Sequence, residues 1–241
     1  MSLYDIAGLK VNMDLRFPFT LDRAKAYLVG EDAEKPDITV EVSDEELERW
    51  IKRFKSDEFS DQYEYMLAGG SFYRQILDFD GMMLHSSAVV VDGNAYLFSA
   101  KSGTGKSTHT ELWLKLFGDK AYILNDDKPA IRYVDGSLYA YGTPFSGKHD
   151  ISSNTRAKVK GICFIERAKE NRIEKIAPSK SIPLMLEQTL RSSDIGYMDK
   201  LLFVMDKLLN NVNVYKLYCN MDISAARLSY ETMSNAEEPN A

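Results

Sequence analysis

The chain reads Asn94-Ala95-Tyr96-Leu97-Phe98-Ser99-Ala100-Lys101-Ser102-Gly103-Thr104-Gly105-Lys106-Ser107-Thr108 near its middle. The residues before Ala100 are mostly apolar and predict a strand, whereas Thr108 to Phe117 carries apolar side chains at helical spacing. A glycine-rich loop between a strand and a helix can bind phosphate, because its backbone N–H groups and the helix N-terminus face the anion. We therefore expect a nucleotide-binding loop made by Ser102, Gly103, Thr104, Gly105, Lys106, Ser107 and Thr108.

The loop departs at one position from the phosphate-loop pattern G-x-x-x-x-G-K-[ST], because Ala100 stands where the pattern has its first glycine. In that pattern the lysine contacts the outer phosphates, and the serine or threonine hydroxyl binds the metal. We assign these roles to Lys106 and Ser107. A glycine-rich turn that binds nothing is the alternative, and the position of the loop between a strand and a helix disfavours it.

The segment before the loop predicts an antiparallel hairpin. Met82 to Val91 is apolar and rich in β-branched residues, and Asp92-Gly93 separates it from the strand at 94–99. Two apolar runs around an Asp-Gly pair are the strongest local signal for a hairpin. Most phosphate-loop enzymes place this strand in a parallel sheet, so we expect an unusual α/β fold whose sheet is mixed and largely antiparallel. His85 lies in the first arm, where a histidine is either a core residue or a functional one.

Two adjacent carboxylates follow the next expected strand. Ala121 to Leu124 is apolar and leads into Asn125-Asp126-Asp127. A phosphate-loop enzyme needs a carboxylate for Mg²⁺, usually at the end of a nearby strand. One aspartate can hold the metal while the other accepts the proton of an acceptor hydroxyl, and the sequence does not decide which does which. Solvated surface charges are the alternative for this pair.

Basic residues after the acidic pair are further candidates. Lys148 ends a polar loop that is flanked by glycines. Its ammonium group can neutralise phosphate charge or position an acceptor, and a solvated loop lysine is an equal alternative. Arg132, Arg156 and Arg167 are weaker candidates of the same kind.

The chain divides by pattern into a small α+β region at 1–80, a catalytic domain at 81–233 and a disordered polar tail at 234–241. Asp135-Gly136 predicts a second hairpin. After the acidic pair we expect strands at 129–134, 137–141, 159–166, 172–176 and 212–218, and helices at 180–190, 194–209 and 223–232.

The N-terminal region predicts both strands and helices. Its expected elements are strands at 6–15 and 38–42 and helices at 44–54 and 63–77. Ser43 is a plausible N-cap for the first helix, and Glu46 stands three residues on, as in a capping box. Gly69-Gly70 lies in the middle of the second helix and lowers its helix propensity.

Composition excludes several classes of protein. The 241 residues carry a formal net charge of −6, which disfavours a nucleic-acid partner because such proteins usually have a basic excess. No apolar run approaches the ~18 residues that span a bilayer, and the N-terminus lacks the pattern of a signal peptide. We therefore expect no membrane partner and a cytoplasmic location. Cys163 and Cys219 lie in apolar, strand-like runs and predict buried core thiols.

Three segments, in this order, resemble the HPr kinase/phosphorylase family, which shares a wider fold group with phosphoenolpyruvate carboxykinase. They are Leu84-His85-Ser86-Ser87-Ala88-Val89 with the hairpin that follows, Ser102-Gly103-Thr104-Gly105-Lys106-Ser107, and Asn125-Asp126-Asp127. The resemblance covers about residues 81 to 135. It implies an HPr kinase-like catalytic domain that uses ATP and Mg²⁺ to phosphorylate a serine hydroxyl.

The resemblance also implies roles for individual residues. His85 resembles a histidine near the transferred phosphate, and Lys106 and Ser107 resemble ligands of the nucleotide and of Mg²⁺. Asp126 resembles the catalytic base and Asp127 a metal ligand. Together with Lys148, His85 and Asp126 make up the expected catalytic set.

Other features depart from that family. The region before residue 81 is shorter, Ala100 replaces the first glycine, and Thr108 stands where an acidic residue is usual. The chain therefore resembles the shorter HPr kinase-like proteins, and its expected acceptor is a hydroxyl group, such as a serine in a peptide or protein or the hydroxyl of a small molecule. A carboxykinase activity is disfavoured because that enzyme is much longer.

Two other functions stay open. A nucleotide hydrolase that drives a conformational switch would position water instead of an acceptor. A non-catalytic module would only bind nucleotide in a peptide-modification pathway. The sequence does not separate ATP from GTP or pyrophosphate, and it is compatible with a homo-oligomer.

Overall fold

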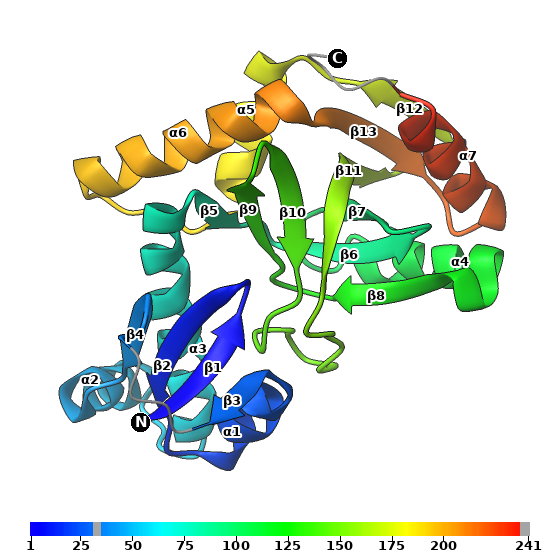
Figure 1. Ribbon diagram of the computed structural model, residues 1–241. Helices are drawn as coiled ribbons and strands as arrows, with labels where there is room; N and C mark the ends of the chain where they lie inside the picture. Colours follow the sequence, from blue (N-terminus) through cyan, green and yellow to red (C-terminus); the bar gives the residue numbers. More distant parts are fainter. Residues whose placement is uncertain (31–34, 237–241) are drawn as a thin grey trace.

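The chain folds around two β-sheets, a smaller one in the N-terminal region and a larger one that carries the glycine-rich loop (Figure 1). The computed structural model describes residues 1–30 and 35–236. The smaller sheet has four strands and the larger one nine. The fold is a mixed α/β fold, as expected. Of the tail expected at 234–241, Ser234 ends a helix, and residues 237–241 lie outside the described residues.

The N-terminal sheet has the strand order β3-β1-β2-β4. The elements of this region are β1 Ser2–Ile6, β2 Leu9–Asp14, α1 Pro18–Ala24, β3 Leu28–Gly30, β4 Ile38–Glu41, α2 Asp44–Phe54 and α3 Ser60–Gln75. The single strand expected at 6–15 was wrong, because Ala7 and Gly8 adopt φ angles of 57° and 70° and turn the chain between two antiparallel strands. Helix α2 begins as expected, with Ser43 and Glu46 in a reciprocal capping box.

The larger sheet has the order β5-β9-β10-β11-β7-β6-β8, and β13 pairs with β11 and β12. Its strands are β5 Gly81–Met83, β6 Ser86–Val91, β7 Asn94–Ser99, β8 Ala121–Asn125, β9 Ala130–Val134, β10 Ser137–Tyr141, β11 Arg156–Arg167, β12 Arg172–Lys175 and β13 Asn213–Cys219. Both expected hairpins are present, as β6–β7 and β9–β10. Among the described strands of this sheet only β11 pairs in parallel, with β7 and β13. The sheet is therefore mixed and largely antiparallel.

Helices cover both faces of the larger sheet (Figure 1). They are α4 Lys106–Phe117, α5 Pro178–Glu187, α6 Ile195–Asn211 and α7 Ile223–Ser234. Successive side chains of β6 point to opposite faces. Val89 and Val91 pack in the core beneath α4 and α7, whereas Ala88 and Val90 pack in the core beneath α5 and α6. Burial of both faces explains why these strands are continuous apolar runs in the sequence.

The apolar run at 82–91 forms two strands instead of one, which corrects the expected first arm of the hairpin. Strand β5 ends at Met83 and β6 begins at Ser86. Between them the N–H of His85 donates to the carbonyl oxygen of Gln188 at 2.7 Å, away from the sheet. His85 therefore lies in the connection between two strands and not within the hairpin.

The parallel pairing of β7 with β11 positions the site. The pairs run from Asn94 opposite Lys158 to Ser99 opposite Phe164, with one shift of register between Val159 and Gly161. Both strands therefore end at the same edge of the sheet, where the glycine-rich loop follows β7 and Arg167 ends β11. Open α/β sheets bind their ligands beyond the carboxyl ends of such strands.

Two further expectations concern the cysteines and the membrane. Cys163 and Cys219 are buried free thiols, as expected. None of the helices within residues 1–30 and 35–236 combines the length and the apolar character needed to cross a membrane.

Candidate functional site

The glycine-rich loop, residues 100–105, joins the end of β7 to the first residue of α4. Gly103 and Gly105 have φ angles of 75° and 122°. A Cβ atom at either position would meet nothing within 4 Å, so the backbone angle and not a lack of space requires glycine there. Arg167 donates to the carbonyl oxygen of Thr104 at 2.9 Å and to that of Gly103. The end of β11 therefore holds the crest of the loop.

Lys106 begins α4, and its ammonium group lies among the polar side chains of the site. Its Nζ is 3.0 Å from Nε2 of His85 and 3.3 Å from the carbonyl oxygen of Ala100. Burial lowers the pKa of Lys106, and the carboxylates of Asp127 and Asp126 oppose this effect. The first N–H groups of a helix have no acceptor within it. The helix N-terminus and the lysine thus present positive charge to the same space.

Asp126 is 8% exposed and is fixed by two hydroxyl groups. Ser87 donates to its Oδ1 at 2.7 Å, and Ser107 donates to its Oδ2 at 3.1 Å. The hydroxyl of Ser107 and this carboxylate are neighbouring oxygen ligands of the kind that Mg²⁺ prefers. Across the described residues there is no cluster of three or more His, Cys, Asp or Glu side chains able to hold a metal. These residues fit Mg²⁺ in the way nucleotide sites do, with phosphate oxygens and water completing the ligands.

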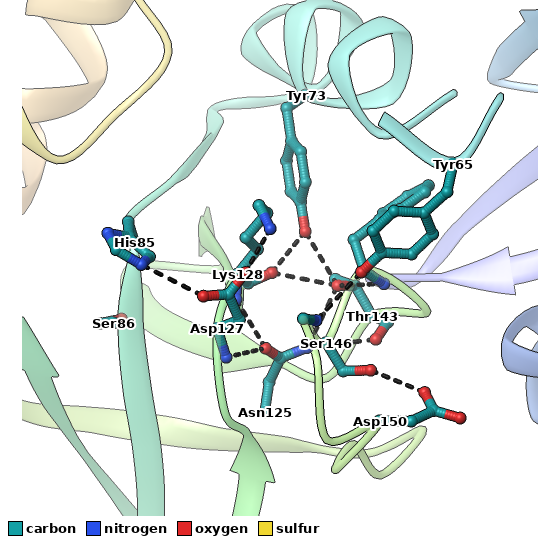
Figure 2. A network of polar contacts seen from close by, with 12 residues as sticks. Tyr65, Tyr73, His85, Ser86, Asn125, Asp127, Lys128, Thr143, Ser146 and Asp150 are labelled. Carbon is teal, nitrogen blue, oxygen red and sulfur yellow. Dashed lines mark hydrogen bonds and ion pairs between the residues drawn. The ribbon is translucent and has the colours of Figure 1, made fainter. Parts of the chain in front are cut away.

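Asp127 contacts a different set of side chains (Figure 2). Its Oδ1 lies 3.1 Å from Nε2 of His85, and the ammonium group of Lys128 contacts its Oδ2. Nδ1 of His85 lies 2.9 Å from Oε1 of Gln188. Burial alone would raise the pKa of Asp127, but the hydrogen bond from His85 and the charge of Lys128 outweigh it and lower the pKa to about 2. Asp127 is therefore a carboxylate at neutral pH.

A buried network around Asn125 fixes the turn that carries both aspartates (Figure 2). Oδ1 of Asn125 accepts from the N–H groups of Asp127 at 3.0 Å and Lys128 at 2.8 Å. Its Nδ2 donates to the carbonyl oxygen of Thr143 at 3.1 Å. The hydroxyl of Tyr73 donates to the carbonyl oxygen of Lys128 and lies 2.8 Å from Oγ1 of Thr143. Helix α3 of the N-terminal region therefore helps to hold the carboxylates in place.

The loop at 143–148 approaches Asp127 so closely that it requires a glycine. Gly147 has a φ angle of 76°, and a Cβ atom there would lie 2.6 Å from Cβ of Asp127. The N–H of Gly147 donates to the hydroxyl of Tyr65 at 3.0 Å. The next residue, Lys148, is exposed to solvent. This contact brings Lys148 to the side of the site that carries Asp127.

Three adjoining cavities surround these side chains. The central cavity, of about 320 Å³, is lined by the glycine-rich loop, both aspartates and Lys148. A strand-end cavity of about 350 Å³ is lined by residues of α4 and of the ends of β11 and β13, and it shares Gly105, Thr108 and Arg167 with the central one. An aromatic cavity of about 610 Å³ lies against the N-terminal region and shares Asp127 and Lys148 with the central one. The central cavity therefore adjoins both of the others.

The structure brings most of the residues expected from the sequence into one place. The central cavity is lined by His85, Ser102, Gly103, Gly105, Lys106, Ser107, Thr108, Asp126, Asp127 and Lys148, whereas Thr104 lines the strand-end cavity. Arg167 lines both. Arg132 lies elsewhere and donates to the carbonyl oxygens of Ala7 and Phe79. Arg156 stacks on the ring of Tyr139, 4.5 Å from its centroid.

Sequence reasoning missed three residues of the site. Gln188 holds His85, Lys128 pairs with Asp127, and Tyr73 supports the turn between them. Lys128 was visible only as the neighbour of the acidic pair. Gln188 follows the last residue of α5 and Tyr73 lies in α3, so both are far from the motif in sequence, and no local pattern marks them.

His109 predicts a change of stability at mildly acidic pH. Its ring is 2% exposed, and burial lowers its pKa from 6.5 to about 4. Below pH ~6.5 His109 becomes protonated in the unfolded chain but stays neutral in the folded one. The free energy of unfolding therefore has its full value above this pH and falls as the pH drops toward ~4. At pH ~4.5 the loss in the free energy of unfolding due to His109 is about 2 to 3 kcal/mol. Urea unfolding at both ends of the range should show this extra loss in the wild type and not in His109→Gln. Equal losses in the two proteins would contradict it.

Comparison with known proteins shows only distant likeness to solved structures. No family model matches the chain, and no curated protein matches it either. Among solved structures, the Hpr(Ser) kinase/phosphatase from Coxiella burnetii is similar with a TM-score of 0.36 and 12% sequence identity, over 63% of this chain and 95% of that chain. This is a distant likeness in fold, and support for a function comes from the side-chain geometry of the site.

Proposed function

We propose that the chain is an ATP- and Mg²⁺-dependent phosphotransferase of the HPr kinase-like type that phosphorylates an alcohol. The series of three cavities carries this proposal. Leu112, Ile165 and Met221 give the strand-end cavity apolar walls that suit a base and sugar. A nucleotide laid through that cavity and along the glycine-rich loop would direct its outer phosphate toward Asp127 and the aromatic cavity, where an acceptor would sit.

The central cavity supports phosphate binding through several groups. Lys106 and the N-terminus of α4 would neutralise and orient the outer phosphates. Ser107 and Asp126 would hold Mg²⁺, which when bound neutralises charge on the transferred phosphoryl group. Lys148 lies between the central and aromatic cavities and would stabilise the negative charge that passes from donor to acceptor.

The contacts of the two carboxylates support a division of roles. The resemblance implied that Asp126 is the base and Asp127 the metal ligand, but Asp126 is the one bonded to Ser107. Asp127 borders the aromatic cavity and is held by His85. Asp127 would accept the proton of the acceptor hydroxyl as the hydroxyl oxygen bonds to phosphorus and the bond from phosphorus to the departing ADP oxygen breaks.

The size of the aromatic cavity favours transfer over hydrolysis. A hydrolase needs room for one positioned water beside the phosphate, whereas this cavity of about 610 Å³ has the size of a site for an organic ligand. A module that only binds nucleotide does not require a carboxylate such as Asp127, held by His85 and Lys128, at the edge of an acceptor cavity. A ³¹P NMR experiment distinguishes the hydrolase and the non-catalytic module from the phosphotransferase.

The proposal is tested by ³¹P NMR of ATP and Mg²⁺ with the purified protein, with and without a mixture of serine-containing peptides and small alcohols. We expect a phosphomonoester resonance only when acceptor is present. Lys106→Ala should lower its rate of formation by about 10²- to 10³-fold, because a charge that stabilises the transferring phosphate is lost. Equal release of ADP and phosphate with and without acceptor would support a hydrolase. Binding of ATP with no turnover would support the non-catalytic module.

A further inference from the structure

The aromatic cavity lies between the N-terminal region and the turn that carries the aspartates. Phe19 and Arg23 of α1 close one side of it, and Phe145 closes another. One face of α3 forms its longest wall, with Gln62, Tyr65, Met66, Gly69, Gly70 and Tyr73 at helical spacing. A ligand in this cavity would have Asp127 at its inner end.

Most of the cavity wall is apolar, although two of the side chains that line it are tyrosines. The hydroxyl of Tyr65 accepts from Gly147, and the hydroxyl of Tyr73 is bonded to Thr143 and to the backbone of Lys128 (Figure 2). Both hydroxyls thus take part in holding loops, and the two rings form part of the cavity wall. The ring of Tyr65 lies 5.6 Å from that of Phe145, centroid to centroid. Such walls recognise flat apolar groups through stacked and edge contacts.

Two glycines make room along the α3 wall. Neither has a φ angle in the left-handed region, so neither is required by its backbone conformation. A Cβ atom at Gly69 would lie 3.0 Å from the ring of Phe145, which therefore packs against bare helix backbone. A Cβ atom at Gly70 would meet only the guanidinium group of Arg74, at 3.8 Å and beyond. Glycine in a helix interior lowers helix propensity. At Gly70 the absence of a side chain leaves open space in the cavity.

We infer that the aromatic cavity binds the acceptor through an apolar, ring-sized group attached close to the hydroxyl that is phosphorylated. This inference rests on the proposed function, since it names the substrate class of the same site. The hydroxyl lies at Asp127, and the ring lies in the open space beside Gly70, against the wall to which Tyr65 and Phe145 contribute. A small polar alcohol such as free serine leaves most of the cavity unfilled and is a poor acceptor.

The transfer is measured with matched pairs of acceptors that share the hydroxyl and differ in the ring. One pair is N-acetyl-seryl-phenylalanine amide and N-acetyl-seryl-glycine amide, and the other is 3-phenylpropan-1-ol and propan-1-ol. We expect kcat/KM to be at least about tenfold higher for the ring-bearing member of one pair or of both, since apolar pockets discriminate by this order. The pair that shows the preference tells whether the ring is carried by a peptide or by a small molecule. Equal values within both pairs overturn the inference and leave the phosphotransferase standing.

Variants test whether this cavity is the source of the preference. Gly70→Leu fills the open space from the α3 wall and should abolish the preference without changing the affinity for ATP. Gly196→Leu is the matched control, because Gly196 is an exposed glycine in the first turn of α6, outside the lining of all three cavities. Met66→Asp is a second test at a position that is 56% exposed, where a charge enters the same wall without disturbing the core. A preference that survives both Gly70→Leu and Met66→Asp overturns the inference.

Calorimetry separates this inference from the proposed function. The probe is N-acetylphenylalanine amide, which carries the ring and no hydroxyl to phosphorylate. Binding to the wild type and to Gly196→Leu, with loss in Gly70→Leu, supports the cavity even if no transfer is found, in which case only the proposed function fails. Absence of binding to the wild type overturns the cavity assignment, whatever the protein does with ATP.

Discussion

Replacing Asp127 by asparagine should lower kcat for phosphoryl transfer by about 10²- to 10⁴-fold, the usual effect of removing a general base. Asparagine has nearly the same shape, so the close approach of Gly147 is preserved. Its amide cannot take up the proton of the acceptor. Because Asp127 contacts His85 and Lys128 and not Ser107, the affinity for ATP and the Mg²⁺ concentration at half-maximal rate should stay near the wild-type values.

Asp126→Asn is the matched comparison, since the same change is made one residue away. Asp126 is bonded to Ser107, so its loss should mainly raise the Mg²⁺ concentration needed for activity. Initial rates measured across a Mg²⁺ series at saturating ATP and acceptor separate the two effects. If Asp126→Asn abolishes kcat at saturating Mg²⁺ while Asp127→Asn changes only the Mg²⁺ requirement, the roles are the reverse, as the resemblance to HPr kinases implied.

The parts of the fold that could be predicted from the sequence are those set by local chemistry. Asp92-Gly93 and Asp135-Gly136 adopt the positive φ angles that tight hairpins need, and both hairpins form. Helix α2 begins where Ser43 and Glu46 can cap it. Such signals lie within a few residues of the feature they specify, so a single sequence reveals them.

Long-range contacts account for the errors. The run at 82–91 is mostly apolar, and its polar residues, His85, Ser86 and Ser87, do not by themselves specify a break at Leu84 and His85. The break exists because His85 donates to the backbone of Gln188 and Ser86 donates to the backbone of Asp127. The parallel pairing of β7 with β11 is equally distant in sequence, and periodicity reports which faces of a strand are buried without naming its neighbour.

The candidate site also has one part that could be predicted from local sequence and another that depends on long-range contacts. Lys106, Ser107 and the two aspartates belong to short motifs whose chemistry is recognisable from spacing. The division of roles between Asp126 and Asp127 depends on which hydroxyl or ring reaches each carboxylate, and that is a property of packed side chains. The small α+β region expected at 1–80 carries no motif of the site, yet Tyr73 reaches the turn beside the carboxylates. Its place at the site follows from the packing of α3 against the larger sheet.

Asn125→Ala should be the most destabilising single change at the site, by about 3 to 5 kcal/mol. Asn125 is fully buried. Alanine would leave the N–H groups of Asp127 and Lys128 without these partners, whereas the carbonyl oxygen of Thr143 would keep the hydrogen bond from Ser152. Each buried polar group left unsatisfied costs about 1 to 3 kcal/mol, and water has little access to replace the lost bonds.

Urea unfolding at neutral pH measures this effect, and Asn154→Ala is its control. Asn154 donates one hydrogen bond to the carbonyl oxygen of Ala26 from an exposed position, so its loss should change the free energy of unfolding by no more than about 0.5 kcal/mol. Below its unfolding transition Asn125→Ala should also transfer phosphate more slowly than Asn154→Ala, because the turn that aims Asp127 is no longer fixed. Similar unfolding free energies for the two variants would mean that the turn is held by Tyr73 and Thr143 alone, and that Asn125 is dispensable to the geometry of both carboxylates.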